Sequence, residues 1–403
     1  MTDPRRTAVI VSAVRTPIGR FLGGLSPLTA TELGGIAIRA ALERSDVDPS
    51  DLDDVILGNV ISAGLGQAPA RQAAIHGGVP ESVGAMTVSR VCGSGLQAVM
   101  LAAQAIRAGD ARVVVAGGME SMSNAPYYLR GYRGGVKFGD QQVVDGLIHD
   151  GLWCAFSECH MGGHAEYTAW KAGIRREEAD AFALESHRKA VAAMDAGKFR
   201  DEIVPVEVKG RRGSVVIDMD EPPRRDTSME ALSRLAPAFP RDVPPEVTDP
   251  IVTAGNSPGL NDGASALVVA SQEYAAAHGL PILAKINAYA TGAVPPREIF
   301  FAPVRAVRRV MEKEGTAIAD YDLIEANEAF AVQALADGKE LGWDWDRVNV
   351  HGGAIALGHP IGASGARILT TLLYALKDRD GERGLATLCL GGGDAVALSV
   401  ERI

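Results

Sequence analysis

VCGSGLQAVM occupies residues 91–100 and predicts a strand end, a tight turn and a helix in succession. A strand-like run at residues 86–90 leads into it. Cys92 would then lie at a helix N-terminus, where unpaired N–H groups and a partial positive charge stabilise a thiolate. We therefore expect the pKa of this thiol to fall below the ordinary value of about 8.5. On its own, the stretch also fits a buried structural cysteine beside a glycine turn.

The composition indicates a large globular protein and argues against a nucleic-acid-binding surface and a disulfide framework. The chain has 403 residues, of which 47% are hydrophobic, and this is enough for a large core in two or three domains. The formal net charge of −10 argues against a general nucleic-acid surface, which would be basic. The spacing of the four cysteines does not suggest a disulfide framework in so long a chain, and with so few neighbouring histidines we expect no zinc site. The alternative is that Cys154 and Cys159 pair, or bind a metal with His160.

The N-terminus carries no recognisable targeting segment. Residues 1–6 run directly into an apolar strand at residues 8–11, without the hydrophobic stretch of a signal peptide. No apolar run reaches about 18 residues, so we expect no transmembrane helix. Together with the reduced cysteines, these features predict a cytoplasmic protein.

The first part of the chain alternates strands and helices. Strands are expected at residues 8–12, 54–60 and 111–116, and helices at residues 29–44 and 69–76. Such alternation is typical of a parallel sheet with helices on its faces. The first helix has capping-box spacing, and the second begins with proline.

The rest of the chain predicts an insertion and a repeat. Residues 122–249 lose the alternating pattern and are interpreted as an inserted domain. Residues 276–403 repeat the order Ser-Gly, apolar helix, strand, Gly-Gly that the first half shows, which suggests internal duplication. The predicted domains are therefore residues 1–121 plus 250–275, residues 122–249, and residues 276–403. Two such halves would bring equivalent strand ends to one shared crevice.

Three residues of the second half supply what a nucleophilic thiol needs. His359 lies in a loop before a helix, Cys389 at a strand end before three glycines, and Asn327 at a strand–helix junction. Imidazole can deprotonate a thiol near neutral pH, and a second thiol can act as acid and base. Backbone N–H groups in glycine-rich turns, or a water held by an asparagine, can stabilise an oxyanion. Each residue alone also fits a structural role.

Six stretches of the sequence resemble the thiolase family, and in particular its acetyl-CoA acetyltransferases. They are residues 91–95, 117–123, 160–162, 327–330, 352–365 and 389–393. They span most of the chain in the family's order. The resemblance implies a five-layered αβαβα fold of two similar halves, with an inserted loop domain over the active site. It also implies a homotetramer or a homodimer.

The same resemblance implies roles for individual residues. Cys92 would be the nucleophile that takes the acyl group from acyl-CoA, and His359 would accept its proton. His359 and a water held by Asn327 would form one oxyanion site. The N–H groups of Cys92 and Gly391 would form the other. Cys389 would remove the α-proton of the second acetyl-CoA, or activate free CoA in the reverse direction.

The implied CoA site lies under the loop domain. His160 and Met161 would touch the pantetheine arm, and Arg225 would meet the adenine or phosphate end of CoA. Ser257 is a further candidate, because the serine that the family often has nearby is replaced here by Pro258. CoA thioesters are substrates, and neither a metal nor an organic cofactor is expected.

Two more departures from the family pattern affect the site. Phe300 and Phe301 replace a glycine-rich segment near the acyl pocket and would change its volume. Asp394 stands where a neutral residue is usual, and a carboxylate close to Cys389 would raise the pKa of that thiol.

The expected activity is the reversible conversion of two acetyl-CoA into acetoacetyl-CoA and CoA through an acyl-enzyme. The alternative is a degradative 3-ketoacyl-CoA thiolase of fatty-acid β-oxidation, acting on longer chains. A ketosynthase on the same scaffold would usually carry histidine in place of Cys389. A non-catalytic acyl-CoA-binding relative would have no need of Cys92, His359 and Cys389 together.

Overall fold

The structure is a computed structural model that describes residues 6–210 and 213–403. Residues 1–5, on which the expected lack of a targeting segment largely rests, lie outside the described residues. In the part of the chain that is described, no helix is long and apolar enough to cross a membrane.

A ten-stranded mixed sheet is the frame of the molecule. Its strands are β1 (Ala8–Arg15), β2 (Gly19–Arg20), β3 (Asp54–Gly58), β4 (Gly84–Val88), β5 (Val113–Ser121), β12 (Asn261–Ser271), β13 (Ala284–Ala293), β14 (Leu323–Ala326), β15 (Arg383–Leu390) and β16 (Asp394–Glu401). Their order is β14-β15-β16-β13-β1-β12-β5-β3-β4, with β2 beside β12. Only two residue pairs join β1 to β13, so the sheet divides there into two halves.

The predicted parallel sheet is wrong for most strand pairs. Among the described strands, β3 pairs in parallel with β4 and β5, and β14 with β15, while the other pairs of this sheet are antiparallel. One reason is β16, which the sequence did not predict. It follows β15 after the short turn at residues 391–393, and so short a connection joins antiparallel strands only.

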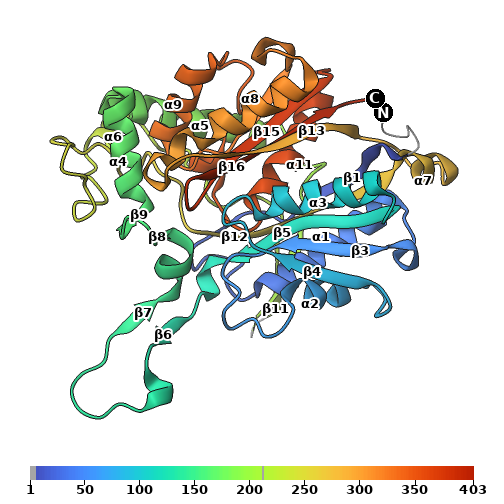
Figure 1. The fold of residues 1–403 in the computed structure, drawn as a ribbon, viewed down its shortest axis with the longest axis horizontal. Coiled ribbons are helices and arrows are strands. Elements are labelled where there is room, and N and C mark those ends of the chain that lie inside the picture. Colours follow the sequence, from blue (N-terminus) through green and yellow to red (C-terminus); the bar gives the residue numbers. More distant parts are fainter. Residues whose placement is uncertain (1–5, 211–212) are drawn as a thin grey trace.

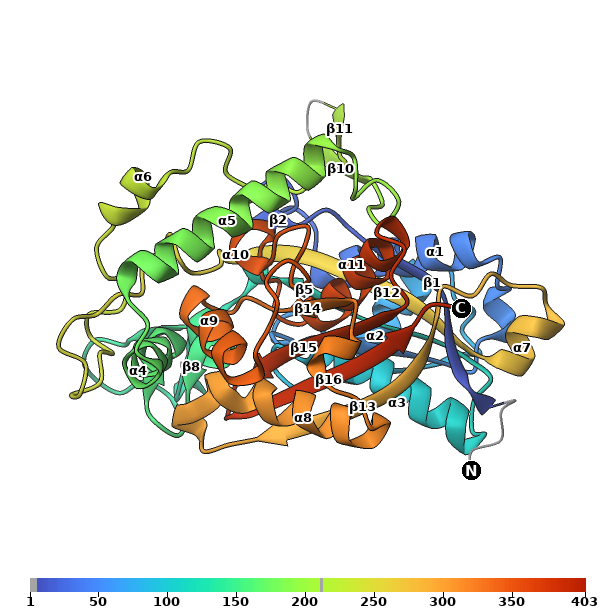
Figure 2. The same cartoon turned by 90° about the horizontal axis from the view of Figure 1, so that it is seen from above.

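The main helices are α1 (Ala30–Ser45), α2 (Pro69–His76), α3 (Ser94–Ala108), α7 (Gln272–Ala277), α8 (Ala302–Glu314), α9 (Ala331–Leu341), α10 (Ala354–Leu357) and α11 (Ser364–Asp378). Helices α3 and α11 share one core with strands of both halves. Helices α1 and α2 cover the outer face of the first half, and α8 covers that of the second. The expected five-layered αβαβα fold is confirmed. Figure 1 shows the two halves stacked about the central helices, and Figure 2 looks down on the second half.

The two central helices touch at equivalent positions of the two halves. A Cβ on Gly95 of α3 would lie 2.8 Å from the amide nitrogen of Ala366, and one on Gly365 of α11 would lie 2.5 Å from that of Leu96. Both distances are shorter than a side chain tolerates, so the helices approach this closely because glycine has no Cβ. Each glycine follows the serine that opens its helix, in agreement with the predicted duplication.

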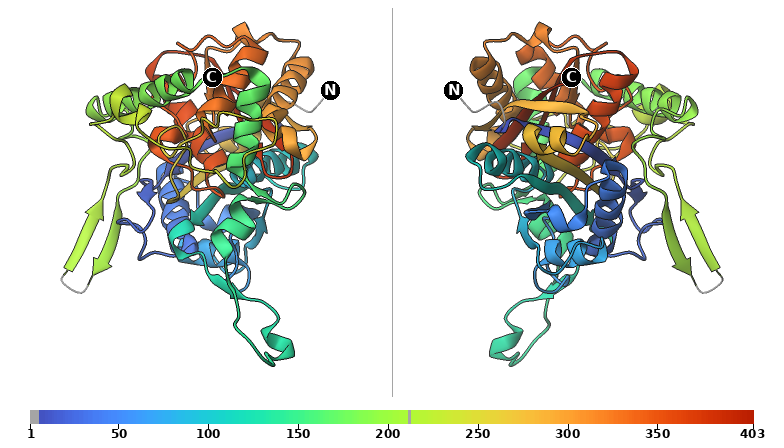
Figure 3. Two further views of the ribbon diagram at one scale, coloured as in Figure 1. Left: turned by 90° about the vertical axis from the view of Figure 1, so that its left-hand side faces the viewer. Right: turned by 90° about the vertical axis from the view of Figure 1, so that its right-hand side faces the viewer.

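The segment predicted as an insertion leaves the sheet after β5. It contains β6 (Tyr127–Leu129), β7 (Val143–Asp145), β8 (Trp153–Cys154), β9 (Cys159–His160), α4 (Met161–Ala172), α5 (Arg176–Asp195), β10 (Val206–Gly210), β11 (Gly213–Ile217) and α6 (Met229–Ser233). The β6–β7 and β10–β11 hairpins project from different sides of the molecule (Figure 3). Short 3₁₀ segments occur at Pro49–Asp51, Met122–Asn124, Tyr132–Gly134, Pro296–Phe301 and Ile318–Asp320, and a π-helical turn at Leu147–Leu152. The domain boundaries themselves stay a prediction.

A buried ion network ties the insertion to the first half. Arg15, at the end of β1, binds Glu202 at 2.5 Å and both carboxylate oxygens of Asp220 at 2.7 and 2.8 Å. All three side chains are buried. Removing one partner would leave a charge uncompensated, so the network fixes where the insertion sits against β1.

Candidate active site

One cavity of about 280 Å³ gathers most of the predicted site residues. It lies where the insertion covers the ends of elements from both halves. Its wall is mainly apolar and includes Val91, Cys92, Met122, Ile148, Leu152, His160, Met161, Phe239, Ser257, Pro258, Ile299, Phe300, Phe330, His359, Ile361, Cys389 and Gly391. Both predicted catalytic cysteines and the predicted base therefore face one space.

Cys92 is held at a strained turn between β4 and α3. Val91 has a φ of 45°, in the left-handed region that a β-branched residue rarely adopts. The Ser94 hydroxyl donates to the Val91 carbonyl at 2.6 Å and accepts from the Arg90 N–H at 2.8 Å. These bonds hold a conformation that costs free energy, and strain of this kind is concentrated at functional sites.

The expected low pKa of Cys92 is wrong. Burial raises the pKa of the Cys92 thiol to about 12, although the N–H groups of Cys92 and Gly391 act in the opposite direction. Burial also raises the pKa of Cys389 well above its ordinary value, and the neighbouring Cys92 adds to the shift. Loss of hydration in an apolar cavity outweighs the helix N-terminus. Both thiols are therefore protonated at neutral pH, and either would need a base before it could act as a nucleophile.

His359 is positioned to be that base. Burial lowers the pKa of its imidazole to about 3, and the Arg367 guanidinium acts in the same direction, so the ring is neutral. Its Nδ1 lies 2.7 Å from the Ser364 hydroxyl, which donates to the Pro360 carbonyl at 2.8 Å. Because the Ser364 hydroxyl proton is donated to Pro360, the Ser364 oxygen accepts a hydrogen bond from Nδ1–H of His359. Nε2 of the neutral ring therefore carries no proton and can accept one.

Asn327 lies behind His359 and does not line the cavity. Its Nδ2 is 3.5 Å from Nδ1 of His359, and the side chain is buried. Among the described residues its Oδ1 has no hydrogen-bond partner, so the amide keeps capacity for a further polar contact. Ser364, which orients the imidazole, was missed as a site residue. The sequence offered one signal for it, its place at the start of the helix that follows His359.

The candidate pantetheine contacts line the cavity. His160 stacks on Phe239 with ring centroids 4.5 Å apart, and its Nδ1 accepts from the Gly162 N–H at 3.0 Å. Burial lowers the pKa of His160, so this ring is neutral. The Ser257 hydroxyl donates to the Thr253 carbonyl at 2.7 Å and can still accept from a ligand. Met161 supplies part of the apolar wall.

A second cavity of about 230 Å³ adjoins the first and shares Ser257, Gly259 and Leu260 with it. Arg20 and Arg224 line this second cavity. Arg225 lines neither cavity. Its guanidinium instead binds both carboxylate oxygens of Asp195, at 2.9 and 2.7 Å. The structure thus turns the neighbouring Arg224, rather than Arg225, toward the space beside the candidate site.

Two of the sequence departures have different effects from those expected. Phe300 is buried and lines the cavity, but Phe301 does not line it and packs under the ammonium of Lys171 at 5.1 Å. Asp394 binds the guanidinium of Arg90, with Oδ2 2.9 Å from Nε. The raised pKa of Cys389 has other causes, led by burial, so the expected effect of Asp394 is wrong.

The alternative of a cysteine-based metal site or disulfide finds no support in the described residues. They contain no cluster of three or more residues that could hold a metal ion, and their four cysteines are free thiols. Cys159 instead lies 3.7 Å from Nε2 of His164.

Nearly the whole chain is similar to known proteins. Residues 8–273 match the family described as "Thiolase, N-terminal domain", and residues 280–402 match "Thiolase, C-terminal domain". An acetyl-CoA acetyltransferase of Pseudomonas aeruginosa is 54% identical over 98% of this chain and 99% of its own. One of Escherichia coli is 53% identical over 99% and 100%. The crystal structure of the Bacillus anthracis acetyl-CoA acetyltransferase superposes with a TM-score of 0.95 at 43% identity, covering 98% of this chain and 99% of that one.

Proposed function

The chain belongs to the thiolase family, and on that premise we propose that it transfers an acetyl group between CoA thioesters, joining two acetyl-CoA into acetoacetyl-CoA and CoA in a reversible reaction. The observation that carries the proposal is one cavity lined by two protonated thiols and a neutral imidazole. That set matches a reaction that stores an acyl group on one thiol and moves a proton with the other.

The first half-reaction forms the acyl-enzyme. Nε2 of His359 takes the proton of the Cys92 thiol, and the thiolate attacks the thioester carbonyl. The oxyanion that forms is stabilised by the N–H groups of Cys92 and Gly391, which already face the thiol. The carbon–sulfur bond to CoA then breaks, and Cys389 gives its proton to the departing thiolate. Cys92 now carries the acetyl group as a thioester.

The second half-reaction forms the carbon–carbon bond. The Cys389 thiolate takes an α-proton from a second acetyl-CoA. Its high pKa as a buried thiol makes it a strong base once it has lost its proton. The carbanion attacks the acetyl thioester on Cys92, the bond between carbon and Cys92 sulfur breaks, and His359 returns the proton. His359, with Asn327 behind it, stabilises the enolate oxygen in this scheme.

The proposed CoA contacts extend from this centre through the adjoining cavity. His160, Met161 and Ser257 would hold the pantetheine arm. Arg224 would meet the phosphates from the second cavity, in place of the expected Arg225. A cationic side chain there is consistent with an anionic ligand on an acidic protein.

Intact-mass measurement after mixing with acetyl-CoA tests the two thiol roles separately. The unaltered protein should gain one acetyl group, Cys92→Ser should gain none, and Cys389→Ala should be acetylated but form no acetoacetyl-CoA. Near-native turnover by Cys92→Ser would disprove the nucleophile assignment. Normal condensation by Cys389→Ala would remove the proposed base.

The names of the relatives favour acetyl transfer over the degradative alternative. Phe300 supports the same choice, since its buried ring occupies part of the cavity wall. Cleavage rates for 3-ketoacyl-CoA substrates of increasing chain length, with free CoA present, measure this preference. We expect activity to be greatest with acetoacetyl-CoA and to fall as the chain lengthens.

Assembly, cofactor need and location are further parts of the proposal. We propose a homotetramer or homodimer, supported by exposed apolar side chains on and around the β6–β7 hairpin, namely Tyr127, Leu129, Tyr132, Phe138 and Val143. Light scattering coupled to size-exclusion chromatography measures the assembly. We also propose that the enzyme is cytoplasmic and needs no metal or organic cofactor, so that dialysis against a chelator leaves its turnover unchanged.

A further inference from the structure

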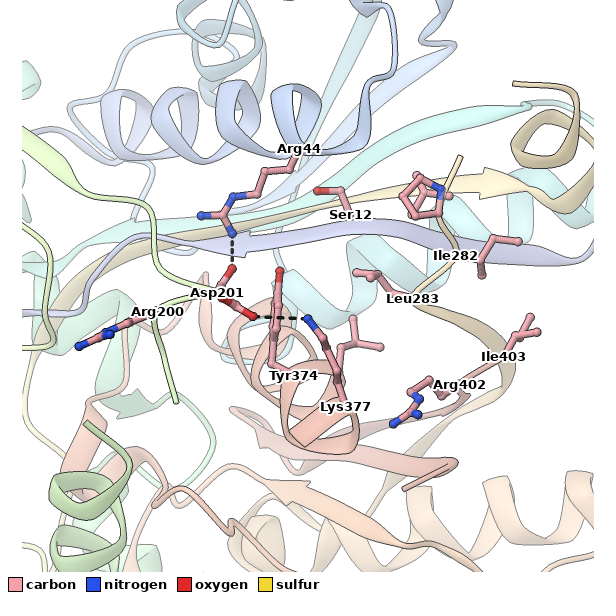
Figure 4. Close-up of a pocket in the computed structure, with 13 residues that line it drawn as sticks. Ser12, Arg44, Arg200, Asp201, Ile282, Leu283, Tyr374, Lys377, Arg402 and Ile403 are labelled. Atoms are coloured by element: carbon pink, nitrogen blue, oxygen red, sulfur yellow. Dashed lines mark hydrogen bonds and ion pairs between the residues drawn. The ribbon is translucent and has the colours of Figure 1, made fainter. Parts of the chain in front are cut away.

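A cavity of about 620 Å³ lies away from the candidate active site. It shares no lining residue with the catalytic cavity or with the cavity adjoining it. Its wall consists of Val11, Ser12, Arg44, Arg200, Asp201, Pro281, Ile282, Leu283, Leu373, Tyr374, Lys377, Arg402 and Ile403 (Figure 4). The volume is within the usual range for small-molecule sites.

The cavity exists because the sheet divides beside it. Strand β1 pairs with β13 at Val9 and Ile10, and its register against β12 shifts between Ile10 and Ser12. Beyond this point the two halves separate. The C-terminal ends of α1 and α11 and the loop at residues 200–201 surround the opening.

The wall is strongly cationic for a chain of net charge −10. Arg44, Arg200, Lys377 and Arg402 line it, against one side-chain carboxylate, that of Asp201, among its described residues. Arg402 is paired with Asp380 at 2.9 Å. Lys377 is 3.4 Å from that carboxylate, in an exposed pair that contributes little.

Not all of these cations are neutralised by partners. The Arg44 guanidinium donates to the backbone carbonyls of Asp201 and Ile203, which do not cancel its charge. In the part of the chain that is described, the Arg200 guanidinium has no hydrogen bond or ion pair. Arg44 and Lys377 also suit the helix C-termini that carry them, but no helix end explains Arg200.

The hydroxyl of Ser12 is a buried polar group in the wall of this cavity. Its side chain is 3% exposed, and its hydroxyl has no hydrogen-bond partner among the described residues. Figure 4 shows this hydroxyl turned toward the side of the cavity on which Arg44 lies. A buried hydroxyl without a partner costs free energy, and a ligand acceptor in the cavity would remove that cost.

The opposite side of the cavity is largely apolar, with Arg402 beside Ile403 at its edge (Figure 4). Pro281, Ile282, Leu283 and Ile403 line it, and Figure 4 shows the labelled apolar residues across from Arg44 and Arg200. A ligand that fits both sides carries an anionic group at one end and an apolar or planar body at the other.

We propose that this cavity binds a small organic phosphate. Its phosphate group lies among Arg44, Arg200 and Lys377 and accepts a hydrogen bond from the Ser12 hydroxyl. Its body packs on the wall at residues 281–283. This inference does not depend on the proposed acetyl transfer, because the two cavities share no residue.

Isothermal titration calorimetry on the full-length protein tests the proposal with three probes. ATP combines an anionic phosphate chain with a planar adenine base. Pyrophosphate provides the anionic group alone, and adenosine provides the planar base without a phosphate. We expect ATP to bind more tightly than either of the others. The double variant Arg200→Ala with Lys377→Ala should weaken ATP binding about tenfold or more, since hydrogen bonds to charged groups are the strong ones.

Ser12→Ala is the sharper variant, because the native hydroxyl makes no bond that its loss could break. It should leave the melting temperature unchanged or raise it, while weakening ATP binding severalfold. Arg188→Ala, an exposed arginine on α5, is the matched control and should bind ATP as the unaltered protein does. Arg224→Ala tests the alternative site beside the catalytic cavity.

The outcomes separate cleanly. Loss of ATP affinity in Ser12→Ala and in the double variant, but not in Arg224→Ala, supports the proposal. If Arg224→Ala alone weakens binding, ATP occupies the CoA region, and the proposal is wrong. It is also wrong if none of the three probes binds at millimolar concentration, or if Ser12→Ala and the double variant bind ATP unchanged.

Discussion

Gly362→Ala should damage catalysis far more than stability. Gly362 follows His359 by three residues, and its N–H donates to Glu120 of β5 at 2.9 Å. A Cβ at this position would lie 2.6 Å from the Glu120 carboxylate oxygen and 2.7 Å from the Met119 carbonyl. Ordinary carbon–oxygen contacts begin about 0.5–0.8 Å further out, so the loop that carries His359 must move away from β5 by about that distance.

The shift acts on the geometry between His359 and Cys92. A displacement approaching 1 Å from a reactive geometry can cost about 100-fold in rate, so we expect the turnover number to fall roughly 10- to 100-fold. An added methyl group in a packed region typically costs about 1–3 kcal/mol of stability, which a protein of this size can tolerate. The assay is acetoacetyl-CoA cleavage with free CoA, beside thermal unfolding followed by circular dichroism.

Gly263→Ala is the matched control. This glycine lies on the neighbouring strand β12, opposite Glu120, and also faces the loop that carries His359. Its Cβ would meet Pro360 at 3.4 Å and Thr16 at 3.6 Å, which are ordinary contacts. Its turnover should stay within about threefold of the unaltered enzyme. Equal losses in both variants, or full activity in Gly362→Ala, would refute the reasoning.

Three further predictions concern the cavity wall, the imidazole and the buried ion network. Phe300→Ala should raise cleavage of longer 3-ketoacyl-CoA substrates relative to acetoacetyl-CoA, at a stability cost of about 3 kcal/mol, whereas Phe301→Ala should leave the ratio unchanged. Burial lowers the pKa of His359 from 6.5 to about 3, so the free energy of unfolding should fall as pH drops from 6.5 toward 3, by up to roughly 1.4 kcal/mol per pH unit, and urea titrations of His359→Gln should show a shallower decline. Asp220→Asn leaves Arg15 with one carboxylate and should lower the unfolding free energy by about 3 kcal/mol, measured by urea denaturation.

Local sequence signals predicted local structure well. The capping box at Thr29 and Glu32 is present, with the Glu32 N–H donating to the Thr29 hydroxyl at 3.3 Å. The helix at residues 69–76 begins and ends as predicted, and the helix after Cys92 ends at Ala108. In each case neighbouring residues determine the backbone, so the pattern and the structure depend on the same short-range interactions.

The wrong predictions concern properties that depend on residues far apart in the sequence. The helix N-terminus beside Cys92 suggested a low pKa, but the cavity that raises it is built from both halves and the insertion. Arg225 was expected at the CoA site, but its guanidinium binds Asp195, and Arg224 lines the adjoining cavity. Asp394 was expected to act on Cys389, and Arg90 binds it instead. None of these contacts has a signal in the local pattern.

The arrangement of the halves explains why the proposed reaction needs both. Cys92 belongs to the first half, and His359 and Cys389 to the second, so no half alone can deprotonate the nucleophile or the second substrate. Both thiols have raised pKa values, so each holds its proton until a base within hydrogen-bond reach removes it. The proposed reaction therefore needs Cys92, His359 and Cys389 close together. That placement depends on the contact between α3 and α11, where Gly95 and Gly365 allow the helices that follow Cys92 and His359 to touch. In the proposed reaction, the duplicated glycines therefore act through the short distance that they permit between the two halves.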